Sequence, residues 1–133
     1  LIIGLTRGTT RAHVVRATLE AIAFEVRDVI DTLPERTSMS ALMVDGGASA
    51  NNLLCQVQAD QLGVPVERPQ IVETTALGAA FLAGLGTGVW ESTDELRETW
   101  NLDRSFEPRG DRAEADAAHR RWREAVERAK GWA

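Results

Sequence analysis

The segment from Ala41 to Asn52, with the sequence ALMVDGGASANN, limits the fold of this chain more than any other stretch. A short apolar run ends at Asp45, two glycines follow at once, and an Asn-Asn pair stands where a helix would begin. This layout is typical of the carboxyl end of a buried strand, where the chain turns tightly and enters a helix. We therefore expect an α/β domain in which the glycine backbone and the helix N-terminus face the same point in space.

Helices and strands alternate on both sides of this turn. Hydrophobic spacing predicts a helix from Arg11 to about Leu33, capped by Thr9 or Thr10. Its expected apolar stripe is Val15, Leu19, Ile22, Val26, Val29 and Leu33. A strand over 38–44, a helix over 51–62 with Gly63 at its end, and a strand over 64–67 follow. A helix over 74–85 is apolar nearly all round, which predicts burial on most sides.

The last third of the chain is more polar. Ser92 and Glu95 predict a capping box for a short helix that ends near Trp100. We expect an irregular or extended linker over 103–108 and a charged helix over 114–132, whose inward stripe is Trp122, Val126, Ala129 and Trp132. Two short strands make a poor sheet, since three or more are usually needed for stability. We therefore expect further strands upstream of Leu1, within a larger protein.

Composition limits the classes of function. The 133 residues suit one domain, and a hydrophobic content of 44% is enough for a packed core. A net charge of −5 and a pI of about 5.0 disfavour partners such as nucleic acid or an anionic membrane. The single cysteine, Cys55, excludes an intrachain disulfide and fits a reducing cytoplasm.

Two interpretations of the Gly46-Gly47 turn are open from spacing alone. In one, the glycine backbone approaches a nucleoside or phosphate, and Asn51 bonds a base or ribose. In the other, the glycines form a tight strand-to-helix turn, with Asn51 or Ser49 as the helix cap. Asp45 is a ligand group or a cap of the turn. The segment 73–75, Glu-Thr-Thr, lines a cleft or, more commonly for such residues, supplies a Thr cap to the next helix.

The remaining reactive side chains predict no chemistry. His13 and His119 are isolated on helices, so we expect no metal site. Cys55 lies among core positions and is expected to be a small buried hydrophobe. Arg120, Arg121 and Arg123 are expected on a solvated helix face. We find neither a GxxxxGK[ST] loop nor a GxSxG motif, and no residue is expected to be catalytic.

Four segments carry a resemblance to a known family. GLTRGTTRAHVVRATLEAIAFEVRDV over 4–29 is similar to its second signature and long helix. Its adenosine-motif block is closely resembled by residues 43–69, MVDGGASANNLLCQVQADQLGVPVERP. The helix that follows this block in the family is similar to residues 73–85, ETTALGAAFLAGL. The tryptophan-containing tail also matches. The chain thus resembles the C-terminal part of the FGGY carbohydrate kinase family, in its glycerol-phosphorylating branch.

The resemblance implies a fold with two actin-like, ribonuclease-H-like domains, of which this chain is the later part of the second. Residues 1–90 would be the α/β nucleotide-binding part and 91–133 a helical C-terminal tail. Gly47 and Asn51 would contact ATP or ADP near the adenosine, and Gly46 would shape the turn. Mg²⁺ would accompany the nucleotide.

The resemblance also implies an activity, ATP + glycerol to ADP + sn-glycerol 3-phosphate, in a cytoplasmic, homo-oligomeric enzyme. Its catalytic Asp, its phosphate-contacting threonines and its glycerol-binding residues match no position here, so these 133 residues alone are expected to be inactive. Two alternatives are a related kinase for another polyol or sugar, and a non-catalytic binding or assembly module.

Overall fold

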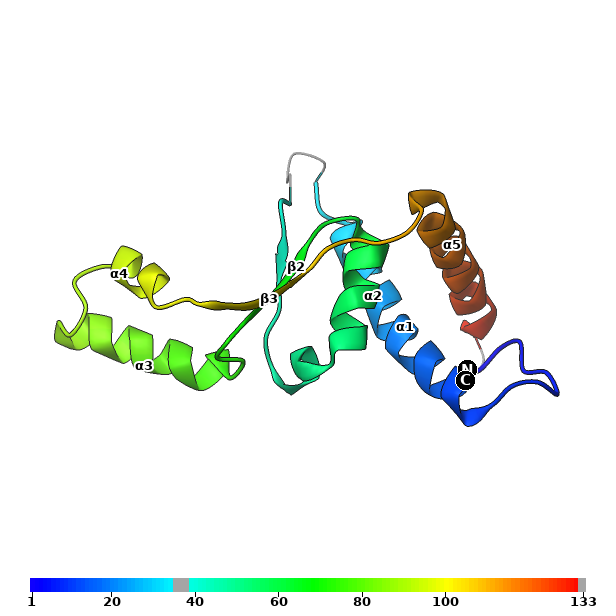
Figure 1. Ribbon diagram of the computed structural model, residues 1–133, viewed down its shortest axis with the longest axis horizontal. Coiled ribbons are helices and arrows are strands. Elements are labelled where there is room, and N and C mark those ends of the chain that lie inside the picture. Colours follow the sequence, from blue (N-terminus) through cyan, green and yellow to red (C-terminus); the bar gives the residue numbers. More distant parts are fainter. Residues whose placement is uncertain (35–38, 132–133) are drawn as a thin grey trace.

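The computed structural model describes residues 1–34 and 39–131. In Figure 1 the chain is elongated: the helices at one end pack side by side, those at the other end project, and a small sheet joins the two ends. The helices are α1 (Arg11–Ile30), α2 (Asn52–Leu62), α3 (Thr74–Thr87), α4 (Thr93–Glu98) and α5 (Arg112–Ala129). The strands are β1 (Leu42–Met43), β2 (Val66–Pro69) and β3 (Leu102–Phe106), and one 3₁₀ helix, η1, spans Gly47–Ala50.

The sheet has three strands in the order β1-β2-β3. β1 pairs with β2 in parallel and β2 with β3 in antiparallel register, so that Val66 faces Leu42 on one side and Phe106 on the other. The extended conformation expected over 103–108 is confirmed at most of these residues, but the expected linker role is wrong, because β3 pairs there with β2. Its polar residues carry no strand signal, and its pairing with β2 is a long-range contact. The strand expected over 38–44 is confirmed only at Leu42–Met43, and Ser38 lies outside the described residues.

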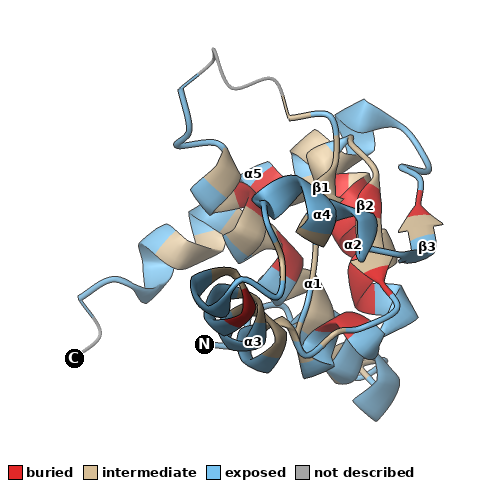
Figure 2. Cartoon of the chain, turned by 90° about the vertical axis from the view of Figure 1, so that its left-hand side faces the viewer, coloured by how far each residue is buried: buried red, intermediate tan, exposed pale blue. Residues whose placement is uncertain are grey.

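The core lies between one face of this sheet and α2. Cys55 and Ala59 of α2 meet Val66 of β2 and Phe106 of β3, and Leu42 and Val44 pack around them. Figure 2 shows the buried positions gathered mainly on α2 and β2, with exposed surface over most of α3 and α4. The core is small, since only seven hydrophobic residues among those described are buried.

The long helix α1 begins as predicted but turns a different face inward. Thr10 caps it, with a capping box completed by His13, and it ends at Ile30 with Asp31 as C-cap rather than at Leu33. Ala23 and Arg27 are its buried residues. The expected inward stripe is largely exposed: Val15 is 54%, Ile22 39% and Val29 63% exposed.

The small-residue helix α3 spans the expected region, but its expected burial is not found, because only Gly84 is buried in it. The Gly84 backbone lies under the Trp90 ring, where a Cβ would clash at 2.1 Å, and Trp90 meets Phe81 edge-on. The short helix α4 has the predicted Ser92 cap, with Ser92 Oγ accepting from the Glu95 N–H. Thus α3 and α4 form a thin projection with little cover among the described residues.

The last helix, α5, packs against α1 and α2. Asp111 caps it by accepting from the Ala113 N–H at 2.8 Å. The Trp122 ring stacks on Phe24 of α1 with centroids 5.6 Å apart, and Val126 is half-buried, whereas Ala129 is exposed. Trp132 lies outside the described residues. Arg120, Arg121 and Arg123 are exposed, as predicted.

Candidate functional site

The turn after β1 has a conformation that only glycine adopts readily. Gly46 has φ 76° and ψ 169°, and η1 follows directly. Ser49 Oγ donates to the Gly46 carbonyl at 2.7 Å, which closes the turn. Asn51 is the N-cap of α2, and its Oδ1 accepts from the N–H groups of Leu53 and Leu54 at 3.0 and 3.1 Å. The capping role of Asn51 is therefore confirmed.

Capping leaves two features of the turn open to a ligand. A Cβ built on Gly47 would meet no atom within 4 Å, so the backbone there can be approached closely. Asn51 is exposed, and its Nδ2 has no acceptor among residues 1–34 and 39–131. The two interpretations of Asn51 are thus compatible: the amide oxygen holds the helix, while the amide nitrogen can donate outward.

The segment before α3 lies beside this turn. The Gly46 N–H donates to the Val72 carbonyl at 2.7 Å, and Thr74 Oγ1 donates to an Asp45 carboxylate oxygen. The Thr cap expected for α3 is wrong, because Glu73 is the N-cap and makes no side-chain capping bond. The hydroxyl of Thr74 instead ties the end of β1 to the start of α3, which fixes one edge of the turn.

Sequence reasoning missed Arg68, which holds the other edge. From β2, its Nη1 donates to the Ser49 carbonyl at 3.0 Å and to Asn52 Oδ1 at 2.9 Å. Its Nε and Nη2 engage Asp103 of β3 at 2.8 and 2.7 Å, and its guanidinium lies over the Phe106 ring. The opposite charges of Arg68 and Asp103 are compatible with an ion pair. They predict one only if β3 is first recognised as a strand beside β2.

Cys55 supports the turn from inside the core. It is fully buried, as predicted, and its Sγ donates to the Ser49 carbonyl at 3.2 Å. Burial raises the pKa of the Cys55 thiol, and the nearby charge of Arg68 only partly opposes this. The thiol is therefore a packing group rather than a nucleophile.

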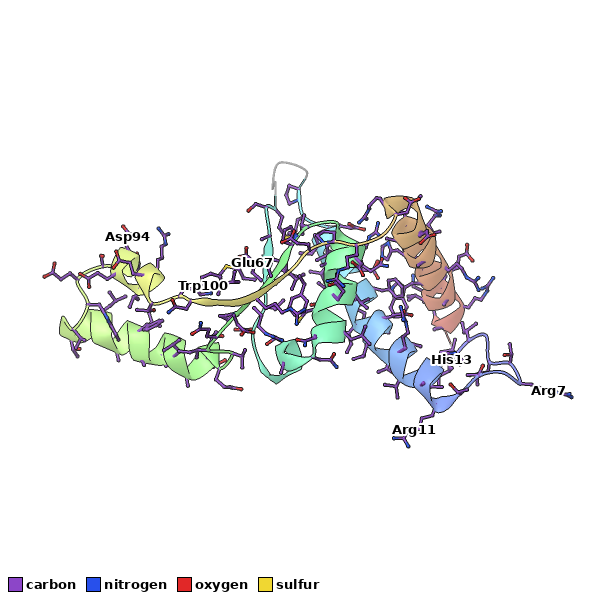
Figure 3. All side chains as sticks on the ribbon, viewed as in Figure 1. Arg7, Arg11, His13, Glu67, Asp94 and Trp100 are labelled. Atoms are coloured by element: carbon purple, nitrogen blue, oxygen red, sulfur yellow. The ribbon has the colours of Figure 1, made fainter. Side chains whose placement is uncertain are left out.

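The opposite face of the sheet borders a cleft of about 600 Å³ between β1, α3 and α4. Its walls are mostly apolar and include Met43, Ile71, Leu77, Phe81, Leu96 and Trp100. Figure 3 places Trp100 at the junction of α4 and β3, far from Arg7, Arg11 and His13 at the other end of the molecule. Thr74 belongs both to this cleft and to the Asp45 contact, so the cleft adjoins the turn.

The described part of the chain has neither a candidate metal centre nor a candidate membrane span. Within it, His, Cys, Asp and Glu side chains do not gather in threes as candidate metal ligands. Of the helices described there, none is both long and apolar enough to cross a bilayer.

Comparison with known proteins decides the family. Residues 1–87 match the FGGY family of carbohydrate kinases, C-terminal domain. The chain belongs to the FGGY family of carbohydrate kinases. It is 56% identical to a glycerol kinase from Caldanaerobacter subterraneus subsp. tengcongensis over 100% of its own length, and 52% identical to one from Halobacterium salinarum over 99%. It spans only 27% and 26% of those two relatives.

Solved structures of FGGY kinases show the same arrangement of elements. A glycerol kinase from Plasmodium falciparum with ADP has a TM-score of 0.82 and 34% identity, covering 96% of this chain and 26% of that one. A xylulose kinase from Rhodospirillum rubrum has a TM-score of 0.75 and 26% identity, covering 92% and 25%. The predicted fold class, part of an actin-like α/β domain, is therefore confirmed. The division at residue 90 and the roles of Gly46, Gly47 and Asn51 stay predictions.

Proposed function

We propose that this chain forms the adenosine-side wall of the nucleotide cleft in an ATP-dependent glycerol kinase. The supporting observation is the turn itself, in which the open Gly47 backbone and the exposed Asn51 side chain both precede α2. Relatives named glycerol kinase match the whole chain at 52–56% identity, and one glycerol kinase structure with this arrangement contains ADP. The reaction would be ATP + glycerol to ADP + sn-glycerol 3-phosphate.

The residues of the turn fit a nucleoside. Gly47 offers a surface without a side chain, on which a flat base or ribose can lie closely. Asn51 Nδ2 offers a donor to a ring nitrogen or a hydroxyl, while Gly46 supplies the bend between β1 and η1. The carboxylate of this turn, Asp45, is bonded to the Thr74 hydroxyl, and we assign it no catalytic role. The phosphoryl-transfer chemistry would therefore come from the rest of the kinase, and the 133 residues alone would be inactive.

Further parts of the proposal concern the whole enzyme. Mg²⁺ would bind with the nucleotide phosphates, and the described residues present no cluster that fits it, so we assign it no ligand in this chain. A homo-oligomeric, cytoplasmic enzyme is proposed on the family resemblance and on the single buried, reduced cysteine.

The nucleotide role is tested by two substitutions of Asn51 in the full-length kinase. Asn51→Ser keeps a good N-cap but removes the amide donor, so ADP binding should weaken by about 0.5–1.5 kcal/mol while stability changes little. Asn51→Ala removes both the N-cap and the amide donor, so this variant should also lose about 1 kcal/mol of stability. Calorimetric titration with ADP and thermal denaturation measure the two effects, and the KM for glycerol serves as the internal control. Unchanged ADP affinity in Asn51→Ser would show that Asn51 is only a cap.

The acceptor is tested by comparing substrates. The full-length kinase should consume ATP with glycerol in strong preference to xylulose, since identity to glycerol kinases is higher than to the xylulose kinase. A preference for the sugar would replace glycerol in the proposal but leave the nucleotide site in place. Glycerol-dependent ATP consumption by the purified 133 residues would contradict the proposed inactivity.

A further inference from the structure

Arg68 contacts the chain on both sides of Asn51. Its Nη1 bonds the Ser49 carbonyl, two residues before Asn51, and the Asn52 side chain, one residue after it. The side chain of Arg68 is only 12% exposed, and its bond to the Ser49 carbonyl is partly buried, whereas its bond to the Asn52 side chain lies at the surface. Asn51 thus lies at the surface between two residues that are bonded to the same guanidinium.

The segment has little means of holding this shape alone. η1 is a single turn of four residues, and such short 3₁₀ turns are weakly stable. The Ser49 carbonyl depends on Cys55 Sγ and Arg68 for its hydrogen bonds, and the Cys55 thiol is a weak donor. Loss of Arg68 would therefore free η1 and the start of α2 to shift together with the Asn51 amide.

The guanidinium is itself rigidly placed. Asp103 accepts from its Nε and Nη2, and the Phe106 ring lies 5.4 Å beneath it. A cation near the first turn of α2 gains nothing from the helix dipole, which favours anions at that end. The position of Arg68 is therefore explained by its directed hydrogen bonds rather than by its charge.

We propose that Arg68 is a positioning residue for nucleotide binding, which acts through Ser49 and Asn52 to set the direction of the Asn51 amide. Asp103 assists it by orienting the guanidinium fork. The inference rests on the proposed nucleotide role of the turn. It assigns no contact between Arg68 and the nucleotide, so the expected effect is on nucleotide affinity and not on kcat.

The test uses the full-length kinase with a matched control. Arg68→Gln removes both bonds to the turn and should raise the Kd for ADP about 10-fold, while the KM for glycerol stays unchanged. Arg68→Lys keeps the charge but not the fork, and Asp103→Asn keeps the fork but loosens it, so each should raise the Kd about 3-fold. Arg104→Gln is the control, because Arg104 stacks on the same Phe106 ring at 4.8 Å and has no bond to the turn.

Three results would overturn the inference. One is an equal rise in Kd for Arg68→Gln and Arg104→Gln, which would assign the effect to the Phe106 ring. Another is a lower melting temperature for Arg68→Gln with unchanged ADP affinity. If Arg68→Gln does not fold, unchanged ADP affinity in both Arg68→Lys and Asp103→Asn has the same meaning. Absence of ADP binding by the unsubstituted kinase is distinct from these, since it would overturn the proposed function together with the inference.

Discussion

The two adjacent glycines of the turn are not equivalent. Gly46 has φ 76° and ψ 169°, a backbone region that is almost closed to residues with a Cβ, whereas the backbone of Gly47 has a negative φ that any residue can adopt. Space is open around both, since a Cβ at either position would meet nothing within 4 Å. Gly46 is thus required by the conformation of the chain, whereas the fold itself places no such requirement on Gly47.

This difference predicts opposite results for two alanine substitutions in the full-length kinase. Gly46→Ala should lower stability by about 1–3 kcal/mol because it strains the backbone. Gly47→Ala should leave stability within about 0.5 kcal/mol but weaken ADP binding, because the added methyl group occupies the ligand's side of the turn. Denaturation measures the stability of both variants, and titration with ADP measures their nucleotide affinity. Normal ADP affinity in Gly47→Ala would mean that the nucleotide does not approach this glycine.

Helix α5 is held on α1 by a polar cluster rather than by apolar packing alone. His119, only 6% exposed at its side chain, lies with Nε2 2.8 Å from Asp28 Oδ1, and Trp122 Nε1 donates to Asp28 Oδ2 at 2.8 Å. Beside it, Arg27 pairs with Asp116 at 2.6 Å and donates to Gln61 of α2. His119 was expected to be isolated, but the fold brings it to a carboxylate 91 residues away.

The charge of Asp28 makes this attachment dependent on pH. Partial burial alone would raise the pKa of Asp28, but the hydrogen bonds from Trp122 and His119, aided by the charges of His119 and Arg123, outweigh it and lower the pKa below its ordinary value. A carboxyl with a depressed folded-state pKa stabilises the fold fully above its unfolded pKa of about 4. That contribution is lost as the pH falls through the folded-state pKa.

We predict that Asp28→Ala loosens α5. The substitution leaves two partly buried donors unpaired, and we expect the opening free energy of α5 to fall by about 1–2 kcal/mol, since Asp28 is 40% exposed and water replaces part of the loss. Amide hydrogen exchange across Arg112–Ala129, compared between pH 7 and pH 3.5, measures it. The difference from the unsubstituted protein should shrink at the lower pH.

The control is Asp94→Ala, which removes an exposed pair with Arg97 and should change exchange little. Equal protection of α5 in Asp28→Ala and the unsubstituted protein would show that the Trp122–Phe24 stack holds the helix without the carboxylate.

The molecule as a whole exposes more apolar surface than its small core accounts for. Val15, Ile22 and Val29 form one exposed stripe on α1, and Leu82 of α3 is 73% exposed. Apolar surface of this extent normally belongs to an interface. The relatives are almost four times as long as this chain, which covers 27% of the first of them. We therefore expect the remaining part of the kinase to cover these faces.

This expectation gives different results for the fragment and the full-length kinase. The isolated 133 residues should bind a hydrophobic dye such as ANS strongly, and replacing Val15, Ile22 and Val29 by Gln should lower the fluorescence by roughly half. In the full-length kinase the same substitutions should cost about 3 kcal/mol or more, because they place polar groups in a buried interface. Arg16→Gln, on the same helix, is the control. It should change neither the dye fluorescence of the 133 residues nor the stability of the full-length kinase.

Light scattering during size exclusion completes this test. A full-length kinase that tolerates the triple substitution but dissociates into smaller assemblies would favour the assembly-module alternative for the stripe. A fragment that is monomeric and binds no dye would contradict the interface altogether.

Local signals in the sequence were sufficient for the helices and the turn. Thr10, Ser92 and Gly63 mark helix ends through contacts within three or four residues, and the Asp-Gly-Gly pattern marks the strand-to-helix turn. Because such contacts form between residues close together in the chain, helix ends and turns can be predicted from the residue types alone. The family resemblance came from the same local blocks.

The tertiary structure alone decided which distant residues meet. β3 has polar residues and exists because β2 offers it backbone partners, and Arg68 finds Asp103 only across that pairing, 35 residues away. His119 and Asp28 meet only because α5 returns to α1. Asn51 shows the same division: its place before α2 predicts the cap, whereas the bonds that Arg68 of β2 makes to Ser49 and Asn52, on either side of it, exist only in the folded chain.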